Sequence, residues 1–330
     1  MQSVTIGNNQ AGQRLDKFLR KYLPEAGSSF LYKMLRKKNI TLNGKKADGS
    51  EKVVLGDEVK IFLSDETFEK FTTEKTELKQ ELKKMQSQIN KTIPILYEDE
   101  NVLILNKPAG LLSQKAKVDD VSIIEHILSY LMESKKVSEE ELNTFKPGVC
   151  NRLDRNTSGV IVAGKSLAGL QEMSELFKDR SLHKYYRCIV KGTINESKCI
   201  KGYLKKDEAM NKVKIYEHAV EDSDYIETEY TPIKKTDRYT LLEVKLITGK
   251  THQIRAHLNS IGHSIIGDTK YGSDATNQYF KKNYGLKYQL LHAYRLEFPT
   301  MTKECEKLSN QVIVAPLNEM FQKIEADLFQ

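Results

Sequence analysis

Hydrophobic residues near the start of the chain recur with the period of an α-helix. Over residues 13–23 they fall on one helical face, at Leu15, Phe18, Leu19, Tyr22 and Leu23. Pro24 ends this pattern, and a second amphipathic stretch runs from Ser29, a suitable N-cap, to the cations at positions 36–38. The pattern therefore predicts two short helices, each with one apolar face.

Short apolar runs after the second helix predict strands. Residues 40–42 and the lysines at 45 and 46 flank Asn43-Gly44, a dipeptide that is typical of a tight β-hairpin. A further apolar run at 59–63 predicts another strand. We therefore expect residues 1–65 to form a small α/β domain.

The next segment, residues 66–92, is charged and contains neither glycine nor proline. Its apolar side chains at Leu78, Leu82, Met85 and Ile89 fit one helical stripe that is too short for a coiled coil. We interpret this segment as a partly helical linker.

Residues 93–330 would then form a second, larger domain. Apolar runs at 102–105 and 160–163 are typical of buried strands, and alternation predicts further strands at 186–190 and 242–247. Helical spacing of apolar residues predicts a helix within 121–145 and another over 167–177.

Composition narrows the class of protein without identifying it. Hydrophobic residues make up 39% of the 330 residues, and no apolar stretch approaches the roughly 18 residues that cross a bilayer. The first residues lack the pattern of a signal peptide, and the four cysteines show no Cys-x-x-Cys spacing. We therefore expect a folded cytoplasmic protein with reduced thiols and no membrane span.

Positive charge is concentrated at the N-terminus. The net charge is +7, and residues 1–63 hold twelve Lys or Arg against six Asp or Glu, a difference of +6. A concentrated positive face is typical of proteins that bind the phosphate backbone of nucleic acids. Charge alone fits an ordinary solvated surface equally well.

The strongest chemical signal is the nonapeptide at residues 151–159. It places Asp154 between Arg152 and Arg155, directly before the apolar run at 160–163. Asp154 therefore belongs in a loop at the edge of a core, where a carboxylate needs a counter-charge. It is either a structural ion-pair partner or a catalytic group.

This nonapeptide closely resembles the catalytic motif of the RluA-type pseudouridine synthases, which modify ribosomal and transfer RNA. The family motif reads His-Arg-Leu-Asp-x-x-Thr-Ser-Gly, and Asn151 stands here in place of the histidine. The resemblance implies that Asp154 is the catalytic residue. It also implies that Arg152 enters the space left by a flipped base.

Two later blocks resemble the same family. Lys184 and Tyr186 match its Lys-x-Tyr pattern, which supplies a tyrosine beside the target base. Residues 248–257 resemble Thr-Gly-Arg-x-His-Gln-Ile-Arg-x-His, with Lys250 in place of the first arginine. The second arginine of that motif is matched by Arg255, which would lie against the catalytic aspartate. His252 and His257 lack the i, i+4 spacing of a helical zinc pair, so we expect no metal site.

Residues 1–65 resemble the S4 RNA-binding domain in the order of their two helices, basic run and hairpin. The resemblance implies candidate RNA contacts at Arg14, Arg36, Lys37, Lys38 and Lys45.

Together these resemblances imply an α+β fold, in which a mixed, mostly antiparallel sheet carries the active cleft and joins a small S4-like α/β domain. They imply an RNA pseudouridine synthase that needs no cofactor, with 23S ribosomal RNA as the first expected substrate, transfer RNA as an alternative, and a monomeric state. Asp154 would be the nucleophile, Arg255 would keep it ionised and oriented, and Tyr186 would pack on the uracil or take part in proton transfer. Lys184 would contact the substrate.

Two other classes of function remain open on the residues alone. A non-catalytic RNA-binding protein could share the fold, although it has no reason to retain Asp154, Tyr186 and Arg255 together. A glycosidase-type hydrolase would need a second carboxylate as acid, and none stands out near these blocks.

Overall fold

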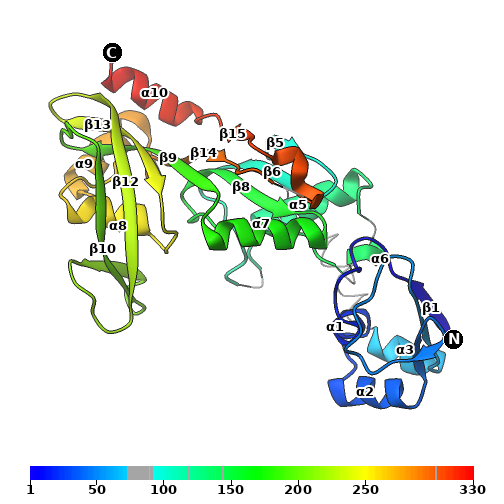
Figure 1. Cartoon of the computed structure of the whole chain (residues 1–330). Coiled ribbons are helices and arrows are strands. Elements are labelled where there is room, and N and C mark those ends of the chain that lie inside the picture. The colour runs from blue at the N-terminus through cyan, green and yellow to red at the C-terminus, as the bar shows by residue number, and fades with distance from the viewer. Residues whose placement is uncertain (73–88, 90–91, 118, 138, 143–144, 302) are drawn as a thin grey trace.

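The structure is a computed structural model that describes residues 1–72, 89, 92–117, 119–137, 139–142, 145–301 and 303–330. The described residues form two sheets that share no strand. Figure 1 shows the smaller sheet and its helices, in blue, as a lobe beside the larger sheet. The helical stripe expected at Leu78, Leu82 and Met85 lies outside the described residues.

The smaller sheet is antiparallel, with the strand order β1-β4-β2-β3. Its strands are β1 (Gln2–Thr5), β2 (Ile40–Leu42), β3 (Lys45–Lys46) and β4 (Glu58–Ile61). The accompanying helices are α1 (Leu15–Tyr22), α2 (Ser28–Arg36) and α3 (Asp65–Phe71). Phe18 of α1, Leu35 of α2 and Ile61 of β4 are fully buried in one core, so the apolar faces of both helices pack as expected.

The expected hairpin is present, because Asn43 and Gly44 both have positive φ, at 51° and 72°, as a tight two-residue turn between twisted strands requires. The cap assigned to Ser29 is wrong. Helix α2 begins at Ser28, two residues before the start that a cap at Ser29 implies, and Gly27 is its N-cap, with a carbonyl that accepts from the N–H of Leu31. Strand β1 was not predicted, because its stability comes from pairing with β4, more than fifty residues away.

The larger sheet has the path β11-β10-β12-β13-β9-β14-β8-β6-β5, with β15 paired to β14 and β7 to β8. Its strands are β5 (Ile95–Glu98), β6 (Val102–Lys107), β7 (Gly148–Val149), β8 (Ser158–Gly164), β9 (His183–Lys191), β10 (Lys198–Asp207), β11 (Lys212–Tyr216), β12 (Ser223–Lys235), β13 (Tyr239–Leu246), β14 (Leu291–Glu297) and β15 (Val312–Val314). Among the described pairs only β14 and β8 run parallel. The sheet is therefore mixed and mostly antiparallel, as expected.

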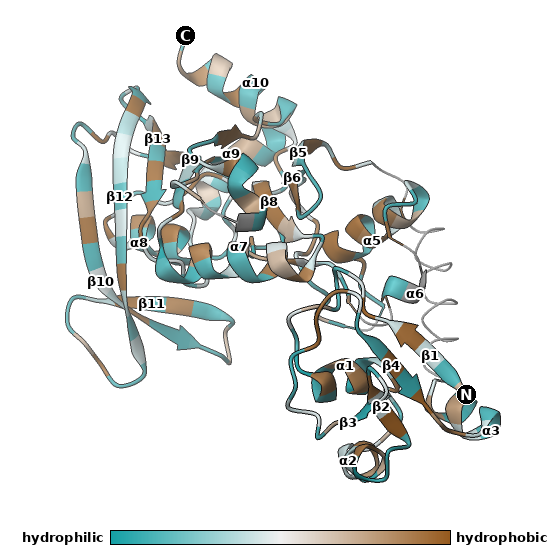
Figure 2. Ribbon diagram, turned by 45° about the vertical axis from the view of Figure 1, so that its right-hand side comes forward, coloured by the Kyte–Doolittle hydropathy of each residue, from teal (hydrophilic) through white to brown (hydrophobic). Residues whose placement is uncertain are grey.

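Helices cover both faces of this sheet. They are α5 (Ile123–Glu133), α6 (Glu139–Leu142), α7 (Leu167–Asp179), α8 (Gln253–Ser260), α9 (Asp274–Tyr284) and α10 (Glu319–Leu328), with a 3-10 turn at Lys303–Leu308. Alternate residues of β8 serve opposite cores: Val160 and Val162 pack with Met173 of α7, while Ile161 and Ala163 pack in the core of α5. Figure 2 shows the resulting hydrophobic colour of β8 and the alternating colours of β10.

The parallel contact between β8 and β14 fixes the end of the nonapeptide. Gly159 pairs with Ala293 and has φ of +112°. A Cβ built on Gly159 would lie 2.1 Å from the carbonyl oxygen of Ala293, which is backbone and cannot move aside. The glycine is therefore needed both for its conformation and for the close approach of β14.

We expect Gly159→Ala to lower the free energy of unfolding by about 3 kcal/mol or more, because it adds a backbone clash to a strained φ. Urea unfolding followed by circular dichroism measures this change. Gly148→Ala is the matched control, since its Cβ would meet only Leu170 Cδ1 at 3.8 Å, and it should change stability by less than about 1 kcal/mol. Equal losses in the two variants would contradict the argument.

Candidate active site

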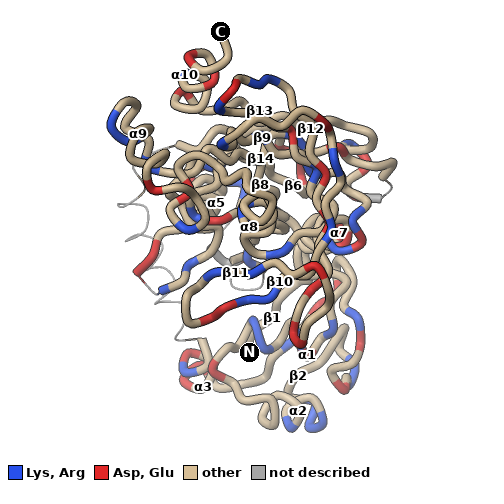
Figure 3. Tube along the Cα trace, turned by 90° about the vertical axis from the view of Figure 1, so that its left-hand side faces the viewer, with Lys and Arg blue, Asp and Glu red and all other residues tan. Residues whose placement is uncertain are grey.

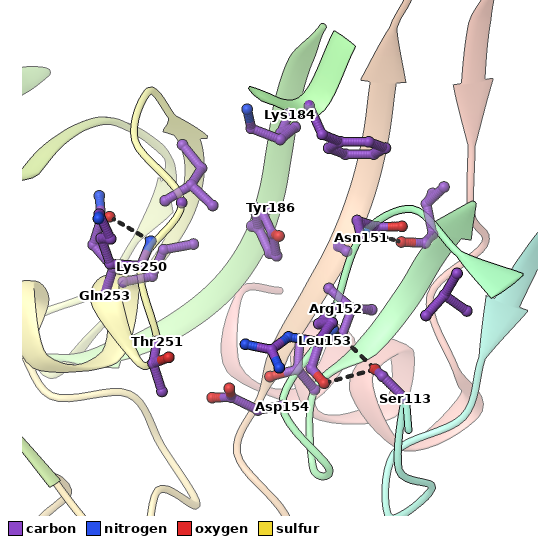
Figure 4. A pocket seen from close by; sticks show the side chains of 18 of the residues that line it. Ser113, Asn151, Arg152, Leu153, Asp154, Lys184, Tyr186, Lys250, Thr251 and Gln253 are labelled. Atoms are coloured by element: carbon purple, nitrogen blue, oxygen red, sulfur yellow. Dashed lines mark hydrogen bonds between the residues drawn. The ribbon is translucent and has the colours of Figure 1, made fainter. Parts of the chain in front are cut away.

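Three sequence blocks that are far apart in the chain line one open cleft of about 910 Å³. Asp154 lies in the loop before β8, Tyr186 on β9, and Arg255 in the first turn of α8. Arg152 and Lys184 line the same cleft, as does Lys250. Figure 4 shows Asp154 and Arg152 on one side of the cleft, Lys250 and Thr251 on the other, and Tyr186 between them.

Arg255 joins two carboxylates. Its Nη1 donates to Oδ2 of Asp154 at 2.7 Å, while Nε and Nη2 donate to Oδ2 and Oδ1 of Asp268 at 2.7 and 3.0 Å. Asp268 is fully buried, whereas the Asp154 side chain is 25% exposed in the cleft. The arginine therefore bonds a buried carboxylate on one side and a cleft carboxylate on the other, and its planar guanidinium sets the direction of the Asp154 carboxylate.

The surroundings of Arg255 and Asp268 favour the charged form of both side chains. Burial alone would raise the pKa of Asp268, but the hydrogen bonds and charge of Arg255, with the N–H groups of Lys270 and Tyr271, hold that pKa below its ordinary value. Burial opposes the charge of Arg255, yet the two carboxylates keep its pKa above the ordinary value. The result is a buried ion pair with one carboxylate in the cleft attached to it.

Tyr186 lies within the wall of the cleft and is only 9% exposed. Burial, reinforced by the neighbouring Asp154 carboxylate, raises the pKa of Tyr186. The side chain is therefore a neutral phenol at physiological pH. This favours packing against a base over abstraction of a proton by a phenolate.

The loop that carries Asp154 is held on both sides by the segment after β6. Before Asp154, Ser113 Oγ donates to the carbonyl of Leu153 at 2.8 Å and accepts from its N–H at 3.0 Å. After Asp154, the carbonyl of Arg155 accepts from Lys107 Nζ at 3.1 Å and from the N–H of Gly110 at 2.8 Å. The backbone on either side of the carboxylate is thereby fixed.

Lys107 is a fully buried lysine beside this loop. Its ammonium donates to three carbonyls, those of Pro108, Leu111 and Arg155. Burial lowers its pKa to about 7, against the attraction of the Asp154 carboxylate. Lys107 does not line the cleft itself, so its role is to support the loop from below.

Asn151, at the position of the motif histidine, connects the Asp154 loop to β8 by hydrogen bonds. Its Nδ2 donates to the carbonyl of Val160 at 3.3 Å, and its Oδ1 accepts from the N–H of Val162 at 2.8 Å. Both contacts reach the backbone of β8. The first residue of the motif therefore anchors the loop here by hydrogen bonds that an amide makes well.

Cations surround the cleft. Arg152 is exposed, and Lys184 is largely buried, with a pKa lowered by burial and then by the charge of Arg180. Lys250 Nζ lies 2.6 Å from Asp224 Oδ1 at the rim. Lys115, Lys178 and Arg295 also line the cleft. This number of basic side chains along the lining suits a polyanionic substrate.

The five candidate RNA contacts of the N-terminal region lie in the smaller lobe, apart from the cleft. Arg36, Lys37 and Lys38 are exposed at the end of α2, and Lys45 is exposed in the hairpin. Figure 3 shows blue segments at the end of α2. Arg14 donates a hydrogen bond from Nε to Oδ1 of Asp16 at 3.1 Å.

Sequence reasoning missed Asp268, His252, Tyr271 and Ser113 as parts of the site. The sequence patterns gave no role to Asp268, Tyr271 or Ser113, and they raised His252 only as a possible zinc ligand. In the structure His252 Nε2 lies 3.9 Å from Asp154 Oδ2, and its Nδ1 lies 3.0 Å from the Tyr271 hydroxyl. The position of His252 inside the third motif was the one available signal.

Within the described residues, no group of three or more His, Cys, Asp or Glu side chains is placed to hold a metal ion. All four cysteines are free. None of the helices described is long and apolar enough to cross a membrane.

Comparison with known proteins agrees with this geometry. The family model described as RNA pseudouridylate synthase matches residues 101–260, which include Asp154, Tyr186 and Arg255. Ribosomal large subunit pseudouridine synthase C of Vibrio vulnificus is 30% identical over 99% of this chain and 96% of its own length. An uncharacterised RNA pseudouridine synthase of Mycoplasma genitalium is 31% identical over 90% of this chain and 88% of its own.

Among solved structures, human RNA pseudouridylate synthase domain containing 4 superimposes with a TM-score of 0.57. It covers 76% of this chain and 97% of its own, at 23% identity, so it shows the shared fold. The sequence match to the relatives extends over nearly the whole chain. The protein therefore belongs to the RNA pseudouridine synthase family and is an isomerase that acts on RNA.

Proposed function

We propose that this isomerase converts uridines of 23S ribosomal RNA to pseudouridine with Asp154 as the nucleophile. The observation that carries the proposal is the way in which the Asp154 carboxylate is hydrogen-bonded. Arg255 holds its Oδ2, no hydrogen bond within the described part of the chain reaches Oδ1, and Asp154 lines the cleft. The substrate class rests on relatives that are named ribosomal large subunit pseudouridine synthase C.

The chemistry makes three demands on the site. The bond from C1′ to N1 breaks, the uracil turns, C1′ bonds to C5, and the C5 proton leaves while N1 gains one. A carboxylate suits the covalent step, whether it attacks C1′ or C6 or promotes a glycal, and a base must remove the C5 proton. The target base must also leave its stack, which the contacts of the cleft offset.

The other cleft residues have matching roles. Tyr186, as a neutral phenol, packs on the turning uracil. Arg152 is exposed beside Asp154 and enters the space that the flipped base leaves. Lys184 and Lys250, which line the cleft, contact phosphates next to the target. No step requires a cofactor.

The smaller lobe adds a second, electrostatic contact with RNA. Its exposed cations at the end of α2 and in the hairpin lie outside the cleft, so they would bind backbone phosphates away from the target uridine. This arrangement suits a large folded RNA. Transfer RNA remains the second candidate substrate, since the same chemistry applies to it.

Neither alternative function has comparable support. A hydrolase needs a second carboxylate as acid, and Asp268, the carboxylate joined to Asp154 through Arg255, is fully buried and already accepts from the guanidinium. A binding protein without activity has no use for an aspartate that is held in an open cleft by a buried arginine.

We expect Asp154→Asn to bind RNA normally and to reduce product formation on the order of 10³-fold or more, because the amide keeps the shape and loses the nucleophile. Tritium release from ribosomal RNA labelled at uridine C5, prepared from a strain lacking this protein, measures the reaction. Asp237→Asn, on an exposed turn outside the cleft, is the control. Full tritium release by Asp154→Asn would show that Asp154 is not the nucleophile. Loss of RNA binding would show that Asp154 has a structural role.

We expect Arg255→Lys to slow a single turnover by roughly 10- to 100-fold with little change in RNA affinity. A lysine cannot bond Asp154 and both oxygens of Asp268 together, so the carboxylate loses its fixed direction. Arg295→Lys is the control, because Arg295 also lines the cleft but bonds Glu243. Equal rates for the two variants, measured with enzyme in excess over RNA, would argue against the bridging role.

We expect simultaneous replacement of Arg36, Lys37 and Lys38 by Gln to weaken RNA binding. The plot of the logarithm of the association constant against the logarithm of salt concentration has a negative slope. Its steepness should decrease by about 2, since each lost phosphate contact removes roughly 0.7. Filter binding over a range of salt concentrations measures this slope. Replacing the exposed Lys281, Lys282 and Lys287 by Gln removes the same charge elsewhere. The idea fails if both triple variants have the same slope.

A further inference from the structure

His252 is held by contacts that determine which of its ring nitrogens carries the proton. It is the N-cap of α8 and adopts a left-handed backbone conformation, with φ of 55°, that few residues other than glycine adopt. Its ring packs edge-on against Tyr271, with centroids 5.7 Å apart. The side chain is 9% exposed and lines the cleft.

The hydroxyl of Tyr271 has two neighbours. The N–H of Val213, on β11, donates to this oxygen at 2.8 Å, and Nδ1 of His252 lies 3.0 Å from it. If Nδ1 carried the proton, both neighbours would donate, and the phenol proton would have no acceptor among the described residues. If Nδ1 is bare, the phenol donates to it and every group is satisfied.

The second arrangement places the imidazole proton on Nε2, the nitrogen that faces Asp154. Nε2 lies 3.9 Å from Oδ2, the same oxygen that Arg255 Nη1 contacts. Burial, with the charges of Arg255 and Lys270, lowers the pKa of His252 against the attraction of Asp154 and Asp268. The ring is therefore neutral at physiological pH, and its Nε2–H is a dipole aimed at the carboxylate.

We propose that His252 is a positioning residue, held by Tyr271 with its proton on Nε2, which points Nε2–H at Oδ2 of Asp154 and so leaves Oδ1 as the oxygen that reacts. The proposal rests on the role of Asp154 proposed above. The distance of 3.9 Å is longer than a hydrogen bond, and catalytic contacts that are long in a free enzyme often tighten in the complex with substrate. The chain of contacts runs from β11 through Tyr271 and His252 to the catalytic loop.

The first test reads the proton directly and needs no activity. In full-length protein labelled with ¹⁵N-histidine, long-range ¹H–¹⁵N spectra distinguish the two tautomers, and the signal lost in His252→Gln assigns the residue. We expect the Nε2–H form in the wild type and a mixture of both forms in Tyr271→Phe. An Nδ1–H form in the wild type, or an unchanged tautomer in Tyr271→Phe, would overturn the inference.

The second test compares two amides that differ by one methylene. Asn tolerates the left-handed conformation of position 252 but is too short to reach Asp154, whereas Gln carries an N–H donor about where Nε2 lies. We expect the single-turnover rate to fall about tenfold in His252→Asn and to stay within roughly threefold of wild type in His252→Gln, with RNA affinity unchanged in both. Equal rates in the two variants, or a rise in the Kd for RNA that accounts for the loss, would remove the positioning role.

The two tests separate this inference from the proposed function. If Asp154→Asn keeps its activity while the wild type shows the Nε2–H form, Asp154 is not the nucleophile but the tautomer assigned to His252 is correct. If Asp154→Asn is inactive while the wild type shows the Nδ1–H form, the nucleophile stands and the role of His252 is wrong.

Discussion

The contact on which the site depends is the bridge from Asp268 through Arg255 to Asp154. A fully buried carboxylate such as Asp268 is tolerated only with a partner, and loss of that partner would cost about 3–5 kcal/mol. Arg255 meets this demand with two hydrogen bonds and keeps one N–H for Asp154. The buried ion pair between Arg255 and Asp268 thus fixes the direction of the Asp154 carboxylate in the cleft. Because the ion pair is strong, the position of that carboxylate is well defined.

The backbone of the loop that carries Asp154 is also held by hydrogen bonds. Ser113 bonds both backbone groups of Leu153, and Lys107 and Gly110 bond the carbonyl of Arg155. Residues 107–113, at and just after the end of β6, therefore support a loop that lies 40 or more residues further along the chain. The carboxylate is held from its own backbone and from Arg255, so little reorganisation is needed when substrate binds.

Much of the site could be predicted from the sequence because three motifs each carry a residue with a recognisable role. Asp154, Tyr186 and Arg255 were expected in one site, and the structure brings them to one cleft. What escaped prediction depends on contacts between distant segments. Strand β1 exists only through β4, and Asp268 and Tyr271 acquire their roles from Arg255 and His252, which precede them in the chain. Local patterns also misplaced the cap of α2, because Ser29 and Gly27 both suit that position and only the packed helix distinguishes them.

The position of β14 in the sheet has a consequence for the order in which the protein matures. This strand lies between β9 and β8 and so joins two halves of the sheet. One half runs from β11 to β9, which carries Tyr186, and the other runs from β8, which follows Asp154, to β5. It spans residues 291–297, near the end of the chain. While the ribosome is still making the protein, the two halves have no shared strand, and contacts of such long sequence separation form slowly. The cleft is therefore completed only after residue 297 has been synthesised, and a nascent chain that ends before β14 would hold Asp154 without its full surroundings.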